Sequence, residues 1–274
     1  MYKLGAFYHQ LHAGIEEEGF KDDAEAFEAI RKEGVTAVEF RYKVIEAGTP
    51  ELLKKTGMVT ASVHGDIPLN FKTDKLYNES CDRMKEAIDK AIYVNSPFFM
   101  SVPQRPEDFD EADDKAFREA SRAQITELCD YVKNKPIKVT VEDYSTLEQP
   151  YATFEDIDTV LNANPTLGFT YDSGNFPLAG FDEIEGLKRY IDRTVYVHLK
   201  DMKVVKEPTN ICRRGEYYDN PALGGGELNI IEALKILKSA GYTGTLTLEM
   251  NSPTERFIRT VKSAEWIKKV LAEI

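Results

Sequence analysis

The chain has 274 residues, of which 42% are hydrophobic, so it can fill a sizeable core within a single domain. Its 35 basic and 47 acidic residues give a formal net charge of −12, and this overall field repels nucleic acids and anionic membrane surfaces, so we expect neither as a partner. Three widely spaced cysteines without a CxxC pair, an N-terminus without a signal pattern and no run long enough to cross a membrane predict a cytoplasmic protein.

The first part of the chain alternates strand-like runs with helical ones. Hydrophobic residues recur with the period of a helix between Asp22 and Gly34 and again in a long amphipathic segment over 73–95. In order, the predicted elements are a strand at 3–8, a polar loop at 9–18, a helix at 22–34, strands at 36–40 and 59–64 around a short helix at 50–55, the helix at 73–95 and a strand at 97–102.

The second part continues this alternation after an acidic loop at 103–114. Thr153, with Asp156 three residues later, indicates the start of a helix. The segment 202–223 has no convincing period and is far longer than a typical strand-to-helix loop, so we expect a functional lid there. The predicted elements are helices at 117–128, 153–161, 181–191, 229–240 and 257–271, and strands at 137–142, 167–172, 195–200 and 244–249.

Eight short apolar strands that alternate with helices predict an α/β fold, a (β/α)8 barrel that forms one domain over residues 1–274. A doubly wound open sheet is the alternative. It is disfavoured because no GxGxxG follows the first strand, and because the three glycines at 224–226 precede a helix without a strand before them.

Four of the predicted strands end at, or one or two residues beyond, a side chain that can bind a metal. The C-terminal ends of barrel strands meet at one mouth, so ligands far apart in sequence can surround one ion there. One imidazole with three carboxylates is a mostly hard set of ligands, which suits manganese, magnesium or cobalt better than a thiolate zinc site does. The four residues are Glu142, Asp172, His198 and Glu249.

Further polar residues near strand ends are candidates for substrate contacts. His64, His9 and Glu39 could reach substrate hydroxyls, although each could equally be a capped or solvated residue. Lys200 and Asp201 follow the histidine candidate closely and could orient the loop or reach substrate, although a surface ion pair is nearly as good an interpretation. In the expected lid, two adjacent basic residues could hold an anionic or hydroxyl-rich substrate; they are Arg213 and Arg214.

Four stretches of the chain resemble the sugar-phosphate isomerase/epimerase superfamily, the xylose-isomerase-like TIM barrels: GGGELNIIEALKILKSAGYTGTLTLE, TLGFTYDSGN, VYVHLKDM and VTVEDYSTLE. The resemblance spans nearly the whole chain, and its most specific part is the order Glu, Asp, His, Glu on the last four strands. It implies that these four residues bind one divalent metal ion, with manganese first and magnesium, cobalt or zinc as alternatives.

The ketose 3-epimerase branch of this superfamily offers two further comparisons. That branch has a glutamate six residues after the first ligand, and Glu148 stands at that spacing here. It also has a histidine three residues after the aspartate ligand, where this chain has Asn175. The resemblance therefore implies Glu148 and Asn175 as substrate-binding positions, and the change to asparagine weakens any transfer of that branch's substrate.

The leading hypothesis is a metal-dependent isomerase or epimerase that transfers a proton next to the carbonyl of a small sugar or polyol derivative, with Glu142 and Glu249 as base and acid. A dehydratase of the inosose or dehydroshikimate type is the second hypothesis, and a catalytically silent sugar-binding barrel is the third. An endonuclease is disfavoured by the charge and by only four histidines. No phosphate-binding loop is visible, which favours an unphosphorylated substrate, and the sequence leaves open whether the chain forms a homo-oligomer.

Overall fold

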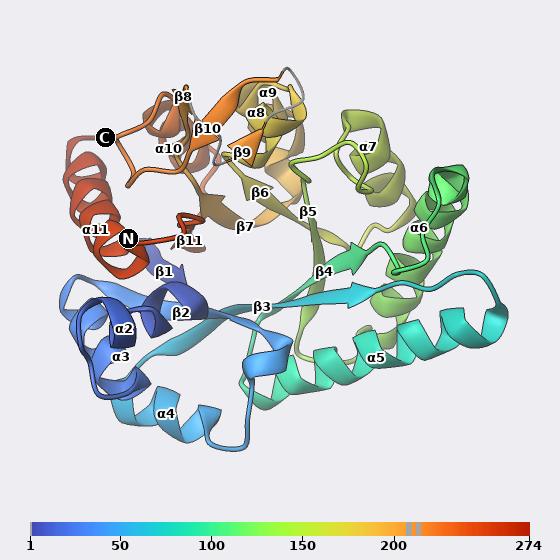
Figure 1. Cartoon of the computed structure of the whole chain (residues 1–274), viewed down its shortest axis with the longest axis horizontal. Helices are drawn as coiled ribbons and strands as arrows, with labels where there is room; N and C mark the ends of the chain where they lie inside the picture. The colour runs from blue at the N-terminus through green and yellow to red at the C-terminus, as the bar shows by residue number, and fades with distance from the viewer. Residues whose placement is uncertain (1, 207–209, 212–214) are drawn as a thin grey trace.

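The computed structural model describes residues 2–206, 210–211 and 215–274, and a closed barrel of eight parallel strands forms its centre (Figure 1). Around the barrel the strands follow the order β1, β11, β7, β6, β5, β4, β3, β2. This arrangement confirms the predicted (β/α)8 fold. The barrel strands are β1 (Lys3–Phe7), β2 (Val35–Arg41), β3 (Val59–Pro68), β4 (Phe98–Gln104), β5 (Lys138–Glu142), β6 (Gly168–Asp172), β7 (Thr194–Leu199) and β11 (Thr245–Leu248).

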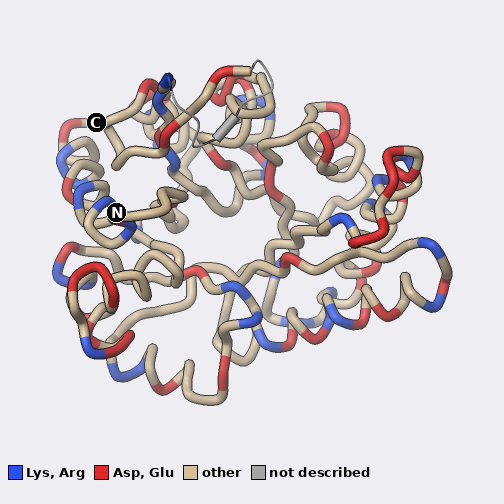
Figure 2. The backbone as a smooth tube through the Cα atoms, in the orientation of Figure 1, with Lys and Arg blue, Asp and Glu red and all other residues tan. Residues whose placement is uncertain are grey.

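Helices surround the barrel and cover its outer face (Figure 1). In the longest of them, α5, the Thr73 hydroxyl accepts a hydrogen bond from the Leu76 N–H and so caps the first turn. Figure 2 shows that charged residues of both signs are spread over the outer helices. The helices are α3 (Asp23–Lys32), α4 (Thr49–Thr56), α5 (Asp74–Tyr93), α6 (Asp114–Tyr131), α7 (Phe154–Ala163), α9 (Glu183–Tyr190), α10 (Ile230–Ser239) and α11 (Arg256–Glu273), with short 3-10 turns at Tyr42–Val44, Glu111–Asp113 and Ile191–Arg193.

The main hydrophobic core lies between the barrel and these helices, and a second cluster fills the barrel itself. Inside the barrel, the fully buried Tyr196 packs against Ala37 and Ala61, and its hydroxyl meets Thr247 Oγ1 at 2.5 Å. Gly5 makes room for this contact, because a Cβ atom there would lie 2.7 Å from Thr247 Oγ1. The barrel interior is therefore packed with side chains up to the level of the mouth.

The structure corrects the expectation of a polar loop at 9–18, which instead forms the short helices α1 (Tyr8–His12) and α2 (Gly14–Glu17). The reason is that this stretch packs against the barrel. Gln10 is fully buried, and its side chain donates to the Leu248 carbonyl at 3.1 Å and accepts from the Met250 N–H at 3.0 Å. The sequence also gave no sign of α8 (Asn175–Ala179) or of the extension of β3 to Pro68.

In the segment 202–223, the described residues form a small antiparallel sheet of β8 (Lys203–Val205), β10 (Tyr217–Asp219) and β9 (Asn210–Ile211). Asp201 anchors the loop that follows this small sheet, because its carboxylate accepts hydrogen bonds from the N–H groups of Gly224 at 2.9 Å and Gly226 at 3.0 Å. No helix in the described part of the chain is long and apolar enough to cross a membrane.

Candidate metal centre and active site

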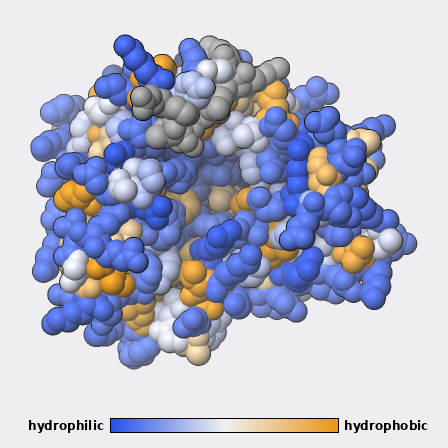
Figure 3. Space-filling model, in the orientation of Figure 1, coloured by the Kyte–Doolittle hydropathy of each residue, from blue (hydrophilic) through white to orange (hydrophobic). Residues whose placement is uncertain are grey.

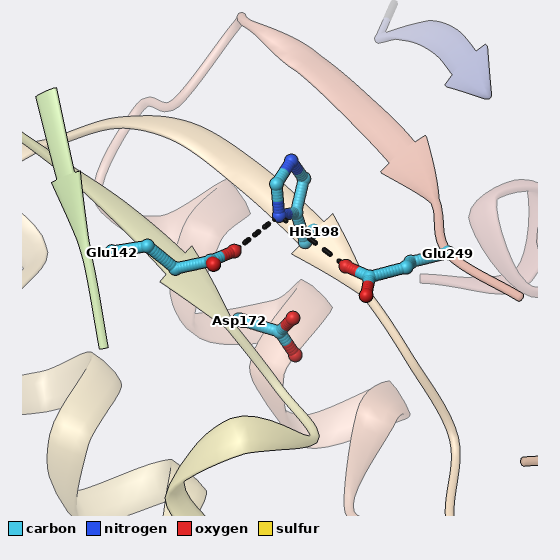
Figure 4. A group of neighbouring side chains, drawn as sticks. All are labelled: Glu142, Asp172, His198 and Glu249. Atoms are coloured by element: carbon cyan, nitrogen blue, oxygen red, sulfur yellow. Dashed lines mark hydrogen bonds and ion pairs between the residues drawn. The ribbon is translucent and has the colours of Figure 1, made fainter. Parts of the chain in front are cut away.

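The structure brings the four predicted ligands together at one mouth of the barrel (Figure 4). Two of them end β5 and β6, one lies in β7, and one directly follows β11. One nitrogen or oxygen atom from each side chain lies within 4.8 Å of the corresponding atom of every other. This convergence follows from the parallel order of the strands, as the sequence predicted, while the role of the residues as ligands stays a prediction. The four are Glu142, Asp172, His198 and Glu249.

His198 presents its two ring nitrogens to different partners. Its Nδ1 atom faces Glu142 Oε1, with which it pairs, and lies 3.4 Å from Glu249 Oε2 (Figure 4). Its Nε2 atom lies 2.7 Å from Glu39 Oε2. A metal-binding histidine commonly donates its other ring N–H to a carboxylate in this way, which fixes the ring and leaves one lone pair for the ion. Nδ1 is therefore the atom that fits a metal.

The carboxylates at the mouth are crowded and mostly buried. Burial raises the pKa of Asp172 to about 6, although Lys200 opposes that rise, and burial also raises the pKa of Glu142 above its usual value. Like charges removed from water repel one another unless a cation lies among them. One imidazole nitrogen and three carboxylates therefore form a donor set that fits a hard divalent cation.

Lys200 is the cation that the structure places beside these carboxylates. Its ammonium group is buried and lies 2.8 Å from Asp172 Oδ2 and 2.7 Å from Glu249 Oε1. It also donates to Asn175 Oδ1 at 3.1 Å, and the Asn175 amide in turn donates to the Asp143 carbonyl at 2.8 Å. Two of the predicted substrate-binding residues, Lys200 and Asn175, thus contact each other beside Asp172, and neither lines the cavity at the mouth.

A cavity of about 850 Å³ opens over three of the four predicted ligands, Glu142, His198 and Glu249, and Figure 3 shows the hollow near the centre of the face in view. His64, a predicted substrate-binding residue, lines it, as do Phe7 and His9. Two arginines also border the cavity. Arg41 is paired with Asp66, to which its Nε atom donates at 2.7 Å, and Arg256 donates from Nε to the Ser252 carbonyl at 2.7 Å. A cavity of this size and polarity can take a small, hydroxyl-rich molecule.

One of the remaining predicted residues lies away from the site. Glu148 is exposed and borders a separate surface pocket, because Arg105 and Arg118 donate to backbone carbonyls of the loop at 147–149 and hold it over α6. Arg213 and Arg214 lie outside the described residues. None of the described residues of 202–223 lines the cavity at the mouth.

Glu39, which was expected only as a possible contact to substrate hydroxyls, instead contacts other residues of the site. It is fully buried on β2, where its carboxylate contacts His198, His64 and the Tyr196 hydroxyl. Burial alone would raise its pKa, but the two histidines outweigh burial and lower the pKa below the usual value. A lone acidic residue within the apolar run TAVEF was the available signal, because a buried charge needs partners.

Comparison with known protein families gives one match that covers most of the chain. The family described as xylose isomerase-like TIM barrel matches residues 27–270. Among curated proteins, an inosose dehydratase of Clostridium tetani (strain Massachusetts / E88) is 28% identical over 143 residues, which cover 48% of this chain and 46% of that protein. The matched region thus spans about half the length of this relative.

Solved structures show the same fold at low sequence identity. A xylose isomerase-like TIM barrel protein from Mycobacterium smegmatis in complex with magnesium has a TM-score of 0.74 and 14% identity, over 100% of this chain and 97% of that one. A 3-keto-D-glucoside 4-epimerase from E. coli has a TM-score of 0.72 and 13% identity, over 98% of this chain and 100% of that one. At these identities the likeness establishes the architecture.

Proposed function

Because the chain belongs to the xylose isomerase-like TIM barrel family, we propose that it is a divalent-metal-dependent isomerase or epimerase acting in the cytoplasm. Its proposed reaction is proton transfer next to the carbonyl of a small sugar or polyol derivative. The observation that carries this proposal is the group of one imidazole and three carboxylates at the barrel mouth, whose donor atoms lie within 4.8 Å of one another.

The proposed cofactor is one divalent ion, with manganese preferred and magnesium, cobalt or zinc as alternatives, held by Glu142, Asp172, His198 and Glu249. When bound, such an ion supplies Lewis acidity that polarises a carbonyl oxygen and acidifies the neighbouring C–H bond. The hard donor set supports this choice of ions.

Glu142 and Glu249 are the proposed proton-transfer groups. They reach the site from β5 and from the end of β11, and they approach His198 from opposite sides (Figure 4). One carboxylate can then remove a proton from one face of a substrate carbon, and the other can return a proton to the opposite face. Such an arrangement supports epimerisation or isomerisation.

The proposed substrate carries no phosphate. The glycine-rich loop at 224–228 is the sequence feature that most resembles an anion-binding loop, but Asp201 already accepts hydrogen bonds from its Gly224, Gly226 and Leu228 N–H groups. Because those donors are engaged, this loop offers no cradle to a phosphate group.

A dehydratase is the second candidate, and the matched inosose dehydratase favours it. Both reactions begin with removal of the same kind of proton, but a dehydratase then expels a β-hydroxyl group. The test is to incubate the manganese-loaded protein with ketohexoses and with cyclic polyol ketones. An epimer or isomer without new ultraviolet absorption supports the proposal, whereas growth of a conjugated-carbonyl band supports the dehydratase. If neither product forms while metal and sugar both bind, the chain is a binding protein.

A further inference from the structure

Glu39 lies between two imidazole rings at the barrel mouth. Its Oε1 atom lies 2.9 Å from His64 Nδ1, and its Oε2 atom lies 2.7 Å from His198 Nε2. The Tyr196 hydroxyl donates to the same Oε2 atom at 2.8 Å. The carboxylate is fully buried, so these three groups, and not water, satisfy it.

This arrangement dictates where each ring carries its proton. An ionised carboxylate only accepts hydrogen bonds, and a neutral imidazole carries a single N–H. His198 must then carry a proton at Nε2, so Nδ1, the nitrogen that faces Glu142 and Glu249, is the one left to bind a metal once the ion displaces its proton. By the same reasoning His64 must be protonated at Nδ1, which leaves a lone pair on Nε2, and the His64 side chain borders the cavity with 17% of its surface exposed.

Phe7 adds a second restraint on the two rings. Its ring centroid lies 4.9 Å from that of His198 and 5.8 Å from that of His64, and it is tilted against both. Phe7 is itself 7% exposed, so it is held in place by the packing around it. An imidazole ring that packs against an aromatic side chain and is hydrogen-bonded at one nitrogen has little freedom to rotate by 180°.

We propose that Glu39 is a positioning residue that fixes the tautomers of both histidines, and that His64 is a second proton-transfer group of the site. Glu39 keeps His198 Nδ1 free for the metal and His64 Nε2 free for a substrate oxygen. The second half of this inference rests on the proposed function, whereas the first half is independent of any substrate.

The placement of His64 distinguishes its task from that of the glutamates. It lies on β3, and its partner Glu39 lies on β2, whereas the four predicted ligands come from β5, β6, β7 and the end of β11. A substrate in the cavity therefore has the glutamates on one side and His64 on the other. His64 Nε2 takes a proton from a substrate hydroxyl as the imidazolium forms beside Glu39, and it returns that proton to an oxygen later in the cycle, so the histidine is unchanged after one turnover.

The direct test is nitrogen NMR of the protein labelled with ¹⁵N-histidine and loaded with zinc, a diamagnetic ion. The chain has four histidines, so replacement variants can assign each signal. We expect the Nδ1–H tautomer at His64 and an N–H at His198 Nε2, without any substrate present. An Nε2–H tautomer at His64, or an Nδ1–H at His198, overturns the role of Glu39.

The variant Glu39→Gln tests the cause. A carboxamide has one accepting oxygen and one donating NH₂ group, so it can keep only one of the two tautomers. We expect one histidine to change its tautomer and metal affinity, measured by calorimetry, to fall roughly 10-fold to 100-fold. Glu28→Gln, on the exposed face of α3, removes the same charge and should leave both properties unchanged. Unchanged tautomers and affinity in Glu39→Gln refute the proposal.

His64→Gln tests the second half. We expect metal affinity within about twofold of wild type, because His64 lies outside the four-residue ligand group. Turnover should fall on the order of 100-fold with little change in KM. Wild-type turnover removes His64 from the reaction but leaves the tautomer result standing. If no substrate is turned over at all, the proposed function fails separately from the role of Glu39.

Discussion

Replacing Lys200 with methionine should destabilise the metal-free protein strongly. The ammonium group is paired with Asp172 Oδ2 at 2.8 Å and Glu249 Oε1 at 2.7 Å, and the three side chains are 5%, 0% and 11% exposed respectively. Methionine keeps the length and volume of the side chain but leaves two buried carboxylates without their cation. Loss of one partner from a buried ion pair costs about 3–5 kcal/mol. In a chain of this size, each kcal/mol lowers Tm by roughly 2 °C, so we expect a decrease on the order of 10 °C.

The same change should make the protein respond more strongly to metal. A bound divalent cation supplies positive charge to the carboxylates that Lys200 would have neutralised. The rise in Tm on adding manganese should therefore be larger in Lys200→Met than in wild type. Differential scanning calorimetry of the metal-free and manganese-loaded proteins measures both effects.

Lys203→Met is the matched control. Lys203 is exposed on β8, so this substitution removes the same charge three residues away without leaving a buried carboxylate unpaired. We expect its Tm to stay close to wild type with and without metal. If Lys200→Met melts at the wild-type temperature without metal, or gains no more from manganese than wild type does, then Lys200 and the metal do not serve the same carboxylates and the reasoning is wrong.

Three further predictions concern the ligands themselves. Glu142→Gln and Glu249→Gln should each lower turnover on the order of 100-fold while metal content, measured by mass spectrometry, falls only modestly, because an amide oxygen can coordinate but cannot take a proton; full turnover in both would exclude them as the proton-transfer pair. His198→Ala should instead lose metal, and excess manganese should restore part of its activity; undiminished metal content would remove His198 from the ligand set. Because burial raises the pKa of Asp172 from 3.8 to about 6 in the metal-free fold, its contribution to stability is fully present below the unfolded pKa and is lost as pH rises through 6. Urea unfolding of metal-free Asp172→Asn should therefore show less loss of stability than wild type between about pH 4 and pH 7, and equal slopes would contradict the assignment.

The parts of the fold that follow from local periodicity were predictable. Short apolar strands such as 167–172, and the amphipathic helix that became α5, have patterns that identify them without tertiary information. The helices α1 and α2 were missed because their stability comes from long-range contacts. Gln10 looks like a polar loop residue in sequence, but its partners are the backbone of Leu248 and Met250. No local pattern encodes a contact across some 240 residues.

The candidate site divides in the same way. The convergence of the four predicted ligands follows from strand direction alone, so strand ends were sufficient to predict it. The positions of Lys200 and Glu148 were not predictable, because side-chain direction decides the first and the path of a loop decides the second. Lys200 turns into the barrel wall towards Asp172, and Glu148 is carried outward by a loop that arginines fix to α6. The contacts of Glu39 could not be predicted without knowing which side chains meet inside the barrel, since its two histidine partners are 25 and 159 residues away in sequence.

The central claim is that a metal held by this site enables proton transfer next to a substrate carbonyl. The most direct measurement is proton NMR of keto-sugars and cyclic polyol ketones incubated in deuterated water with the manganese-loaded protein, which is removed with its metal before each spectrum is recorded. The account predicts that, for the true substrate, the signal of the C–H next to the carbonyl disappears as deuterium enters, and that chelation or Glu142→Gln with Glu249→Gln prevents the exchange. Exchange or turnover that continues undiminished after exhaustive chelation, or in the double variant, would contradict the claim.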